Sequence, residues 1–237
     1  MEVAVLIDYD NLSETQKVSG ILDVATKVLM QLPRIFSATQ GKCDIRIYGG
    51  WYEEENMTLR AQQLSVSIQS DFPAIIRVPM ELGKQIIFKT NAELARALVE
   101  EPSHYLFNTY RKKSKPANIR VLKPEDAGCT NVECSLPVAK KLLKTGKCSA
   151  AGCTTSRADL VYRDEQKIVD TMLTCDLLYY SKLGYNHIML VSGDDDFLPP
   201  IRTAILRGSK VYRVHPTPSN HRASIHIAGT QLVELEL

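Results

Sequence analysis

The positions of apolar residues along the chain predict alternating strands and helices. Continuous runs rich in β-branched residues are typical of strands buried on both faces of a parallel sheet. Apolar residues three and four positions apart are typical of amphipathic helices. The N-terminal part predicts strands at residues 3–7, 44–48 and 74–78, helices at 18–32 and 54–70, and a capping box at Ser13 and Gln16. This alternation is the beginning of an α/β fold.

The regular pattern is interrupted at residues 81–159, which contain short strand-like pieces such as residues 85–88, a basic run and four cysteines. After this segment the sequence predicts helices at residues 164–183 and 197–206, strands at 187–191 and 210–214, and an edge strand at 231–236. We therefore expect one domain over residues 1–237. It should be a doubly wound parallel α/β sheet of strand order 3-2-1-4-5 with helices on both faces, carrying residues 81–159 as an insertion.

Acidic residues follow the first and the fourth predicted strands. The first is followed by Asp-Tyr-Asp-Asn at residues 8–11, and the fourth by Ser-Gly-Asp-Asp-Asp at residues 192–196. In the expected order these strands are neighbours, so their carboxyl ends meet at the edge where open α/β sheets bind ligands. Because carboxylates that converge repel one another, the pattern favours a divalent cation with oxygen ligands, Mg²⁺ or Mn²⁺. The alternative is that Asp195 or Asp196 only caps the following helix.

Two further aspartates lie on the helix expected at residues 164–183. Asp170 is in its first turns and could add a carboxylate to the site; an exposed ion pair with Lys167, three residues away, is the alternative. Asp176 is six residues further on, about 120° round the helix from Asp170. That separation favours a structural role for Asp176.

Together these segments resemble a known family. The motifs are Val-Leu-Ile-Asp-Tyr-Asp-Asn (5–11), Lys-Ile-Val-Asp (167–170) with Asp-Leu-Leu (176–178), and Val-Ser-Gly-Asp-Asp-Asp-Phe (191–197). In this order they resemble the NYN domain of the PIN-like nucleases, the LabA/limkain-type group. Arg-Ile-Tyr-Gly-Gly-Trp-Tyr (46–52) is also similar to the second strand and following loop of that family. The resemblance covers residues 1–80 and 160–215.

The resemblance implies a PIN-like fold and a metal-dependent nuclease that acts on RNA. We expect phosphodiester hydrolysis, endonucleolytic and on single-stranded or tRNA-like RNA, with Mg²⁺ or Mn²⁺ as the catalytic metal. The family more often has a small residue where this chain has Asp195, and the insertion departs from its compact pattern. The residues that match its metal-binding acids are Asp8, Asp170, Asp194 and Asp196, and those that match its polar helpers are Asn11 and Ser192.

The sequence predicts a cytoplasmic protein. No apolar run approaches the ~20 residues that span a bilayer, and the N-terminus has no basic leader, so we expect no membrane partner.

The cysteines predict a second metal site. Thiols in the cytoplasm stay reduced, which favours metal binding over disulfides. Cys129-x4-Cys134 and Cys148-x4-Cys153 have the paired spacing of zinc knuckles, with zinc held across residues 129–153. Free thiols or a redox role are the alternatives; Cys43 and Cys175 are expected as buried core thiols.

Charge is unevenly distributed. Residues 111–147 contain ten Lys and Arg and three Asp and Glu, a local charge of +7, so the rest of a chain of net charge +2 carries −5. Tyr105, Phe107 and Tyr110 precede the basic run and could stack on unpaired bases. The alternative is an ordinary solvated surface. The expected RNA-binding residues are Arg111, Lys112, Lys113, Lys115, Lys140, Lys141 and Lys144.

Two other functions start from the same residues. Asp8-x-Asp10 is also similar to the nucleophile motif of haloacid-dehalogenase-type phosphatases, in which Asp8 would form a phospho-aspartate. That family expects Thr or Val where Leu12 stands, and a later Asp where Phe197 and Leu198 stand. The other alternative is a non-catalytic, zinc-stabilised RNA-binding module with a degenerate acidic site, against which the complete set of acids argues.

Overall fold

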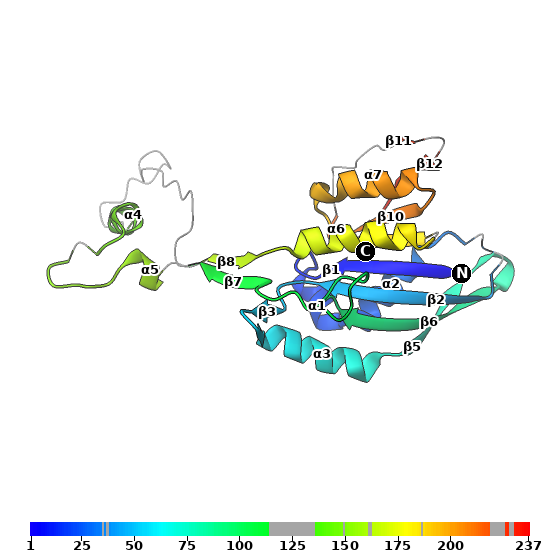
Figure 1. Ribbon diagram of the computed structural model, residues 1–237, viewed down its shortest axis with the longest axis horizontal. Coiled ribbons are helices and arrows are strands. Elements are labelled where there is room, and N and C mark those ends of the chain that lie inside the picture. Colours follow the sequence, from blue (N-terminus) through cyan, green and yellow to red (C-terminus); the bar gives the residue numbers. More distant parts are fainter. Residues whose placement is uncertain are drawn as a thin grey trace. The chain divides into compact units, whose positions relative to one another are not determined.

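The computed structural model of the chain (Figure 1) describes residues 1–34, 36, 38–113, 136–148, 150–160, 163–185, 187–218, 226–227 and 230–237. Its contacts divide it into two units. The first comprises residues 1–109 and 166–237, and the second Tyr110–Glu165. The expected insertion began at residue 81, but residues 85–94 form a strand of the main sheet and so belong to the first unit.

The first unit is built on a seven-stranded mixed sheet in the order β13-β10-β9-β1-β2-β6-β5. All neighbouring pairs are parallel except β5 and β6, which are antiparallel. The strands are β1 (Glu2–Asp8), β2 (Gln40–Tyr48), β5 (Ala74–Pro79), β6 (Gln85–Leu94), β9 (His187–Val191), β10 (Lys210–His215) and β13 (Val233–Glu236). The adjacency of the first and fourth predicted strands is confirmed, as is an edge strand near the C-terminus.

The prediction of a purely parallel sheet in the order 3-2-1-4-5 was wrong at one edge. The predicted third strand, β5, does not lie beside β2, because β6 lies between them and pairs with β5 in antiparallel register. The physical reason is the connection. Only five residues, 80–84, join β5 to β6, whereas a parallel crossover needs a dozen or more. The chain is therefore a mixed α/β fold with a mixed sheet.

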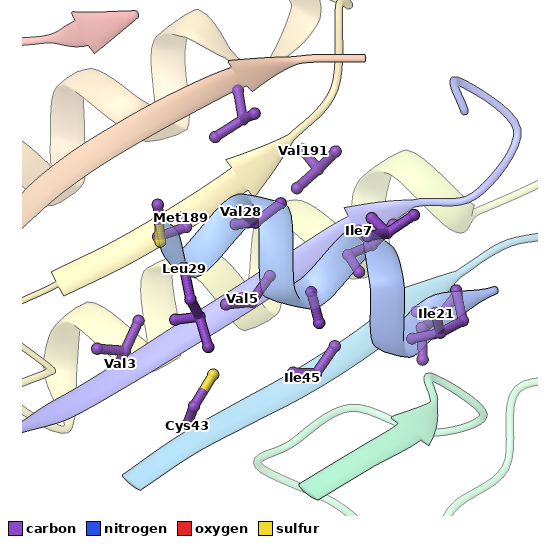
Figure 2. Close-up of a cluster of buried hydrophobic side chains, with 14 of the residues drawn as sticks. Val3, Val5, Ile7, Ile21, Val28, Leu29, Cys43, Ile45, Met189 and Val191 are labelled. Carbon is purple, nitrogen blue, oxygen red and sulfur yellow. The ribbon is translucent and has the colours of Figure 1, made fainter. Parts of the chain in front are cut away.

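Helices cover both faces of this sheet. Side chains alternate along β1, so that Val3, Val5 and Ile7 face one cluster while Ala4 and Leu6 face the other. Figure 2 shows the first cluster, in which α2 packs against β1, β2 and β9. The helices of the first unit are α1 (Glu14–Ser19), α2 (Ile21–Met30), α3 (Leu59–Asp71), α6 (Val169–Lys182) and α7 (Leu198–Leu206).

Local signals explain the helix boundaries. The predicted capping box is confirmed, since Ser13 accepts from the Gln16 backbone and the Gln16 side chain accepts from the Ser13 backbone. Gly20, at φ 88°, divides the expected single helix into α1 and α2. The helix expected from residue 164 begins at Val169, because Arg163–Gln166 forms the strand β8 instead.

The shorter elements complete the description. The second unit contains β7 (Tyr110–Lys113), α4 (Leu136–Thr145) and α5 (Arg157–Leu160). In the first unit β3 (Tyr52–Glu53) pairs with β4 (Asn56–Met57), β11 (His226–Ile227) pairs with β12 (Thr230–Gln231), and 3₁₀ turns lie at Glu81–Gly83 and Asp195–Phe197. Within the described ranges, no helix has the length and apolar character needed to cross a bilayer.

Candidate functional site

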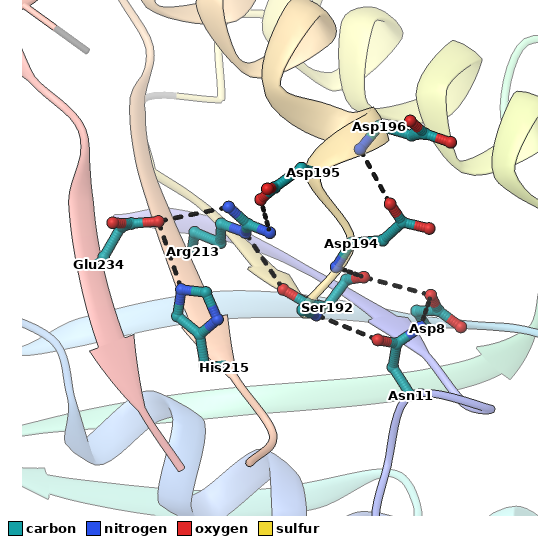
Figure 3. A network of polar contacts seen from close by, with 10 residues as sticks. Asp8, Asn11, Ser192, Asp194, Asp195, Asp196, Arg213, His215 and Glu234 are labelled. Atoms are coloured by element: carbon teal, nitrogen blue, oxygen red, sulfur yellow. Dashed lines mark hydrogen bonds and ion pairs between the residues drawn. The ribbon is translucent and has the colours of Figure 1, made fainter. Parts of the chain in front are cut away.

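The carboxyl ends of β1 and β9 are joined by polar side chains (Figure 3). The parallel register pairs Ile7 with Val191, so Asp8 and Ser192 are the next residues on each strand. The Asn11 amide and the Ser192 hydroxyl both donate to Asp8 Oδ2, at 2.5 and 3.2 Å. The Gly193 N–H donates to Asn11 Oδ1 at 3.1 Å. Asn11 therefore links the two strand ends and orients the Asp8 carboxylate.

The loop after β9 folds on its own side chains. The Asp194 N–H donates to Ser192 Oγ at 3.1 Å, and the Asp196 N–H donates to Asp194 Oδ1 at 2.9 Å. Asp194 is thus the N-cap of the turn at Asp195–Phe197, where the sequence had suggested Asp195 or Asp196. Pro199 and Pro200 then begin α7, where a missing backbone N–H costs little.

Asp195 faces a different partner from the other aspartates of the loop. The fully buried guanidinium of Arg213 donates to Asp195 Oδ1 at 2.8 Å and to the Ser192 carbonyl at 3.3 Å. Its third nitrogen lies 3.3 Å from Glu234 Oε1, and that carboxylate lies 3.3 Å from His215 Nε2. Asp195 therefore anchors the loop to β10 and β13. Sequence reasoning missed this group, for which the signal was an arginine inside an apolar strand.

The electrostatics of the site are dominated by negative charge. Asp8 is 4% exposed, and burial, followed by the charge of Asp170, raises its pKa from 3.8 to about 6, although the Ser192 hydrogen bond opposes the shift. The pKa of Asp170 is raised by burial and by the charges of Asp194 and Asp196. Asp170 is therefore linked electrostatically both to Asp8 and to Asp194 and Asp196, the acids that the sequence predicts to form one site.

Asp10 has a partner of its own. Its carboxylate pairs with Arg60 at 3.0 Å, and the two side chains are 35% and 60% exposed. Burial raises the pKa of Asp10, while the charges of Arg60 and Lys17 lower it. Asp10 is therefore held by cations on α3 and α1, unlike Asp8.

Asp176 belongs to a separate, buried polar group. Its carboxylate accepts from the Tyr48 hydroxyl and the Val99 N–H, each at 2.8 Å, and lies 3.2 Å from Arg46 Nε. Arg46 in turn bonds to Glu93 and to the Ala97 carbonyl. These contacts tie α6 to β2 and to the segment after β6, as the structural interpretation of Asp176 requires.

The donor chemistry of the site fits a hard divalent cation. Asp8, Asp170, Asp194 and Asp196 offer carboxylate oxygens, the ligands that Mg²⁺ and Mn²⁺ prefer. In the side-chain positions of the described residues, however, no three His, Cys, Asp or Glu side chains are grouped so that they could hold one ion. The fit therefore rests on donor type and charge, not on a preformed coordination sphere.

The remaining predicted sites lie in the second unit. Cys129, Cys134 and Lys115 lie outside the described residues, as do the side chains of Lys112 and Lys113. Arg111, Lys141 and Lys144 are exposed, and Lys140 is half-buried. The described members of the cysteine pairs are Cys148, which is half-buried, and Cys153, which is exposed.

The two isolated cysteines differ from each other. Cys43 is buried in the core, as expected. Cys175 is exposed, which corrects its expected burial. It lies on α6 about 140° from the centre of the buried stripe, which contains Met172, Leu173 and Leu177.

Compared with known proteins, the chain matches no family model and shows no significant similarity to a curated protein or a solved structure.

Proposed function

We propose that this protein is a metal-dependent ribonuclease whose site lies at the carboxyl ends of β1 and β9. The observation that carries the proposal is the state of Asp8. It is buried at the end of β1, and the side chains of Asn11 and Ser192 donate hydrogen bonds to it. Among the described residues no cation pairs with it. A buried carboxylate close to other acids is costly unless a cation compensates it. The chain's resemblance to PIN-like nucleases supports the same function.

Asp8, Asp170, Asp194 and Asp196 would hold Mg²⁺ or Mn²⁺. When bound, such a cation activates water and stabilises the charge that develops on a scissile phosphate. The chain's own residues orient the ligands. Asn11 and Ser192 fix Asp8 Oδ2, and the Arg213–Asp195 pair holds the loop that carries Asp194 and Asp196.

The proposed substrate is RNA, cut endonucleolytically in a single-stranded or tRNA-like form. The exposed cations of the second unit, Arg111, Lys141 and Lys144, suit contacts to a phosphate backbone, which an acidic site alone would repel. We place the activity in the cytoplasm, where cysteines such as Cys148 and Cys153, which form no disulfide, stay reduced.

The test is cleavage of end-labelled single-stranded RNA, tRNA and DNA with Mn²⁺ or Mg²⁺. We expect Asp8→Asn and Asp194→Asn each to lower the cleavage rate at least about a hundredfold, comparable to the loss of one electrostatic group from an active site. Asp10→Asn is the matched control, since Asp10 pairs with Arg60, and it should cleave at close to the wild-type rate. Wild-type protein that cuts none of these polymers would refute the proposal.

The same three variants separate the alternatives. A haloacid-dehalogenase-type phosphatase would release phosphate from p-nitrophenyl phosphate and would need Asp10 as well as Asp8. A non-catalytic RNA-binding module would retain RNA in a mobility-shift assay after Asp194→Asn and would never shorten it. The nuclease requires cleavage that depends on Asp8 and Asp194 but not on Asp10.

A further inference from the structure

The second unit, Tyr110–Glu165, is compact but has no hydrophobic core in its described part. Where side-chain burial is described (110–111, 139–148, 150–157, 159 and 165), each residue is half-buried or exposed. The unit has 56 residues, counting both ends. Units of this size seldom gain enough stability from burial alone, and disulfides or a structural metal commonly supply the rest.

A tight turn in this unit brings two thiols together. Lys147 and Ser156 form an antiparallel bridge, and inside it the Cys148 N–H donates to the Thr155 carbonyl at 3.1 Å. At the tip the Cys153 N–H donates to the Ala150 carbonyl at 3.2 Å. This path places Cys148 and Cys153 on the two arms of one hairpin-like turn.

The turn also brings the two side chains within reach of each other. The Cys148 thiol and Thr155 both lie close enough to the Cys153 thiol to act on it. Two neighbouring cysteines on one turn are a usual ligand pair of a structural zinc ion.

The turn is also fixed to the rest of the unit. The Arg157 N–H donates to the Gly146 carbonyl at 3.0 Å, and its guanidinium donates to the Leu143 carbonyl at 2.6 Å in the last turn of α4. The thiols are thus held on a short support between α4 and α5. Two preorganised thiols lose less conformational entropy on binding a common ligand than two on a free loop.

We propose that Cys148 and Cys153 are two ligands of a structural zinc ion that stabilises the second unit, whose described side chains form no hydrophobic core. Zinc is the metal that thiolates select in structural sites, and such sites are tetrahedral and closed by four protein ligands. Cys129 and Cys134, the partners that the sequence predicts, lie outside the described residues. The zinc site is independent of the acidic site, so either proposal can fail alone.

The test is the zinc content of the full chain, purified under reducing conditions without added metal and measured by elemental analysis and native mass spectrometry. We expect about one zinc per chain in the wild type, and loss of that zinc in Cys148→Ser and Cys153→Ser. Cys175→Ser is the matched control, because it removes an exposed thiol from the first unit, and it should keep the metal.

A second measurement uses the wild type alone and so does not depend on whether the serine variants fold. Wild-type protein refolded with Co²⁺ should show the charge-transfer absorption of cobalt bound to thiolates. Wild-type protein that contains no zinc and gives no such absorption would overturn the proposal. A mass two hydrogens lower, indicating a Cys148–Cys153 disulfide, would also overturn it, as would unchanged zinc in both serine variants.

Discussion

Asp8 and Asp176 are both buried carboxylates of the first unit, and their surroundings differ in one respect. Asp176 has a fixed cation, Arg46, together with hydrogen bonds from Tyr48 and Val99. Asp8 also accepts hydrogen bonds, but the charges acting on it come from Asp170 and Asp10. A buried anion with its own cation is compensated, and removing either partner of the pair destabilises the fold. A buried anion surrounded by other anions leaves room for a cation from solution.

The largest expected effect on stability is at Asp176. Asp176→Ala removes one member of a buried ion pair and leaves Arg46 with only the exposed Glu93 as a charged partner, and breaking a buried pair in this way costs about 3–5 kcal/mol of unfolding free energy. Urea denaturation followed by circular dichroism measures the loss. The control is Asp44→Ala, which removes a carboxylate from the face of β2 that carries Arg46. This variant should lose less unfolding free energy. A loss below about 1 kcal/mol for Asp176→Ala would mean that the pair does not stabilise the fold.

The next largest loss of stability is expected on substitution of Arg213. Arg213→Met removes the arginine that pairs with the buried Glu234 side chain and releases Asp195. We expect a loss of roughly 3 kcal/mol, at the low end for buried pairs because Asp195 is 67% exposed. If Arg213 positions the loop, the variant should also need more Mn²⁺ for half-maximal RNA cleavage at a temperature where it stays folded. An unchanged Mn²⁺ requirement would restrict Arg213 to a structural role.

Substitution of Asp8 should increase stability at pH 7, whereas substitution of Asp176 or Arg213 should decrease it. Its pKa is raised from 3.8 to about 6, so the folded protein binds this proton more tightly than the unfolded chain. In metal-free buffer, stability should therefore fall as pH rises from about 4 to about 6, by no more than about 3 kcal/mol. Asp8→Asn removes this dependence and should be more stable than the wild type at pH 7.

The measurement is the difference in unfolding free energy between wild type and Asp8→Asn in EDTA, since other acids titrate in both proteins. This difference should be close to zero at pH 4 and favour the variant above pH 6. A wild type more stable than Asp8→Asn at pH 7 would show that Asp8 is already compensated.

The smallest effect is expected at Arg60. Its ion pair with Asp10 joins two partly exposed side chains, and such pairs contribute less than about 1 kcal/mol. Arg60→Ala should therefore unfold at nearly the wild-type urea concentration and cut RNA normally. A large loss of cleavage in this variant would place Asp10 in the site and weaken its use as a control.

The parts of the fold that local pattern encodes were predictable. Continuous apolar runs identified β1 and β9, and the Ser13–Gln16 spacing identified the start of α1. β6 was recognised only in part, because polar residues alternate with its buried ones. Its place beside β2 depends on a short connection and on pairing across the sheet, neither of which the pattern of one segment reveals.

The residues of the candidate site were likewise only partly predictable from the sequence. Asp8 and Asp194 lie at or just after the ends of β1 and β9, so their proximity followed once these strands were identified as neighbours. The Arg213–Glu234 pair was missed because it depends on the register of β10 against β13, which places these two residues opposite each other. An edge strand contributes one buried carboxylate to that network, and sequence spacing carries no signal for such a partner.

The most direct test of the account is Mn²⁺ binding, measured by electron paramagnetic resonance on wild type, Asp8→Asn and Asp10→Asn. The cysteines should not confuse the result, since Mn²⁺ prefers oxygen to thiolate ligands. If the carboxylates around Asp8 form a cation site, the wild type should bind Mn²⁺. Asp8→Asn should bind it at least about tenfold more weakly, a loss of about 1.4 kcal/mol of binding free energy. Asp10→Asn should bind Mn²⁺ as tightly as the wild type does. Equal Mn²⁺ affinity in wild type and Asp8→Asn would contradict the account.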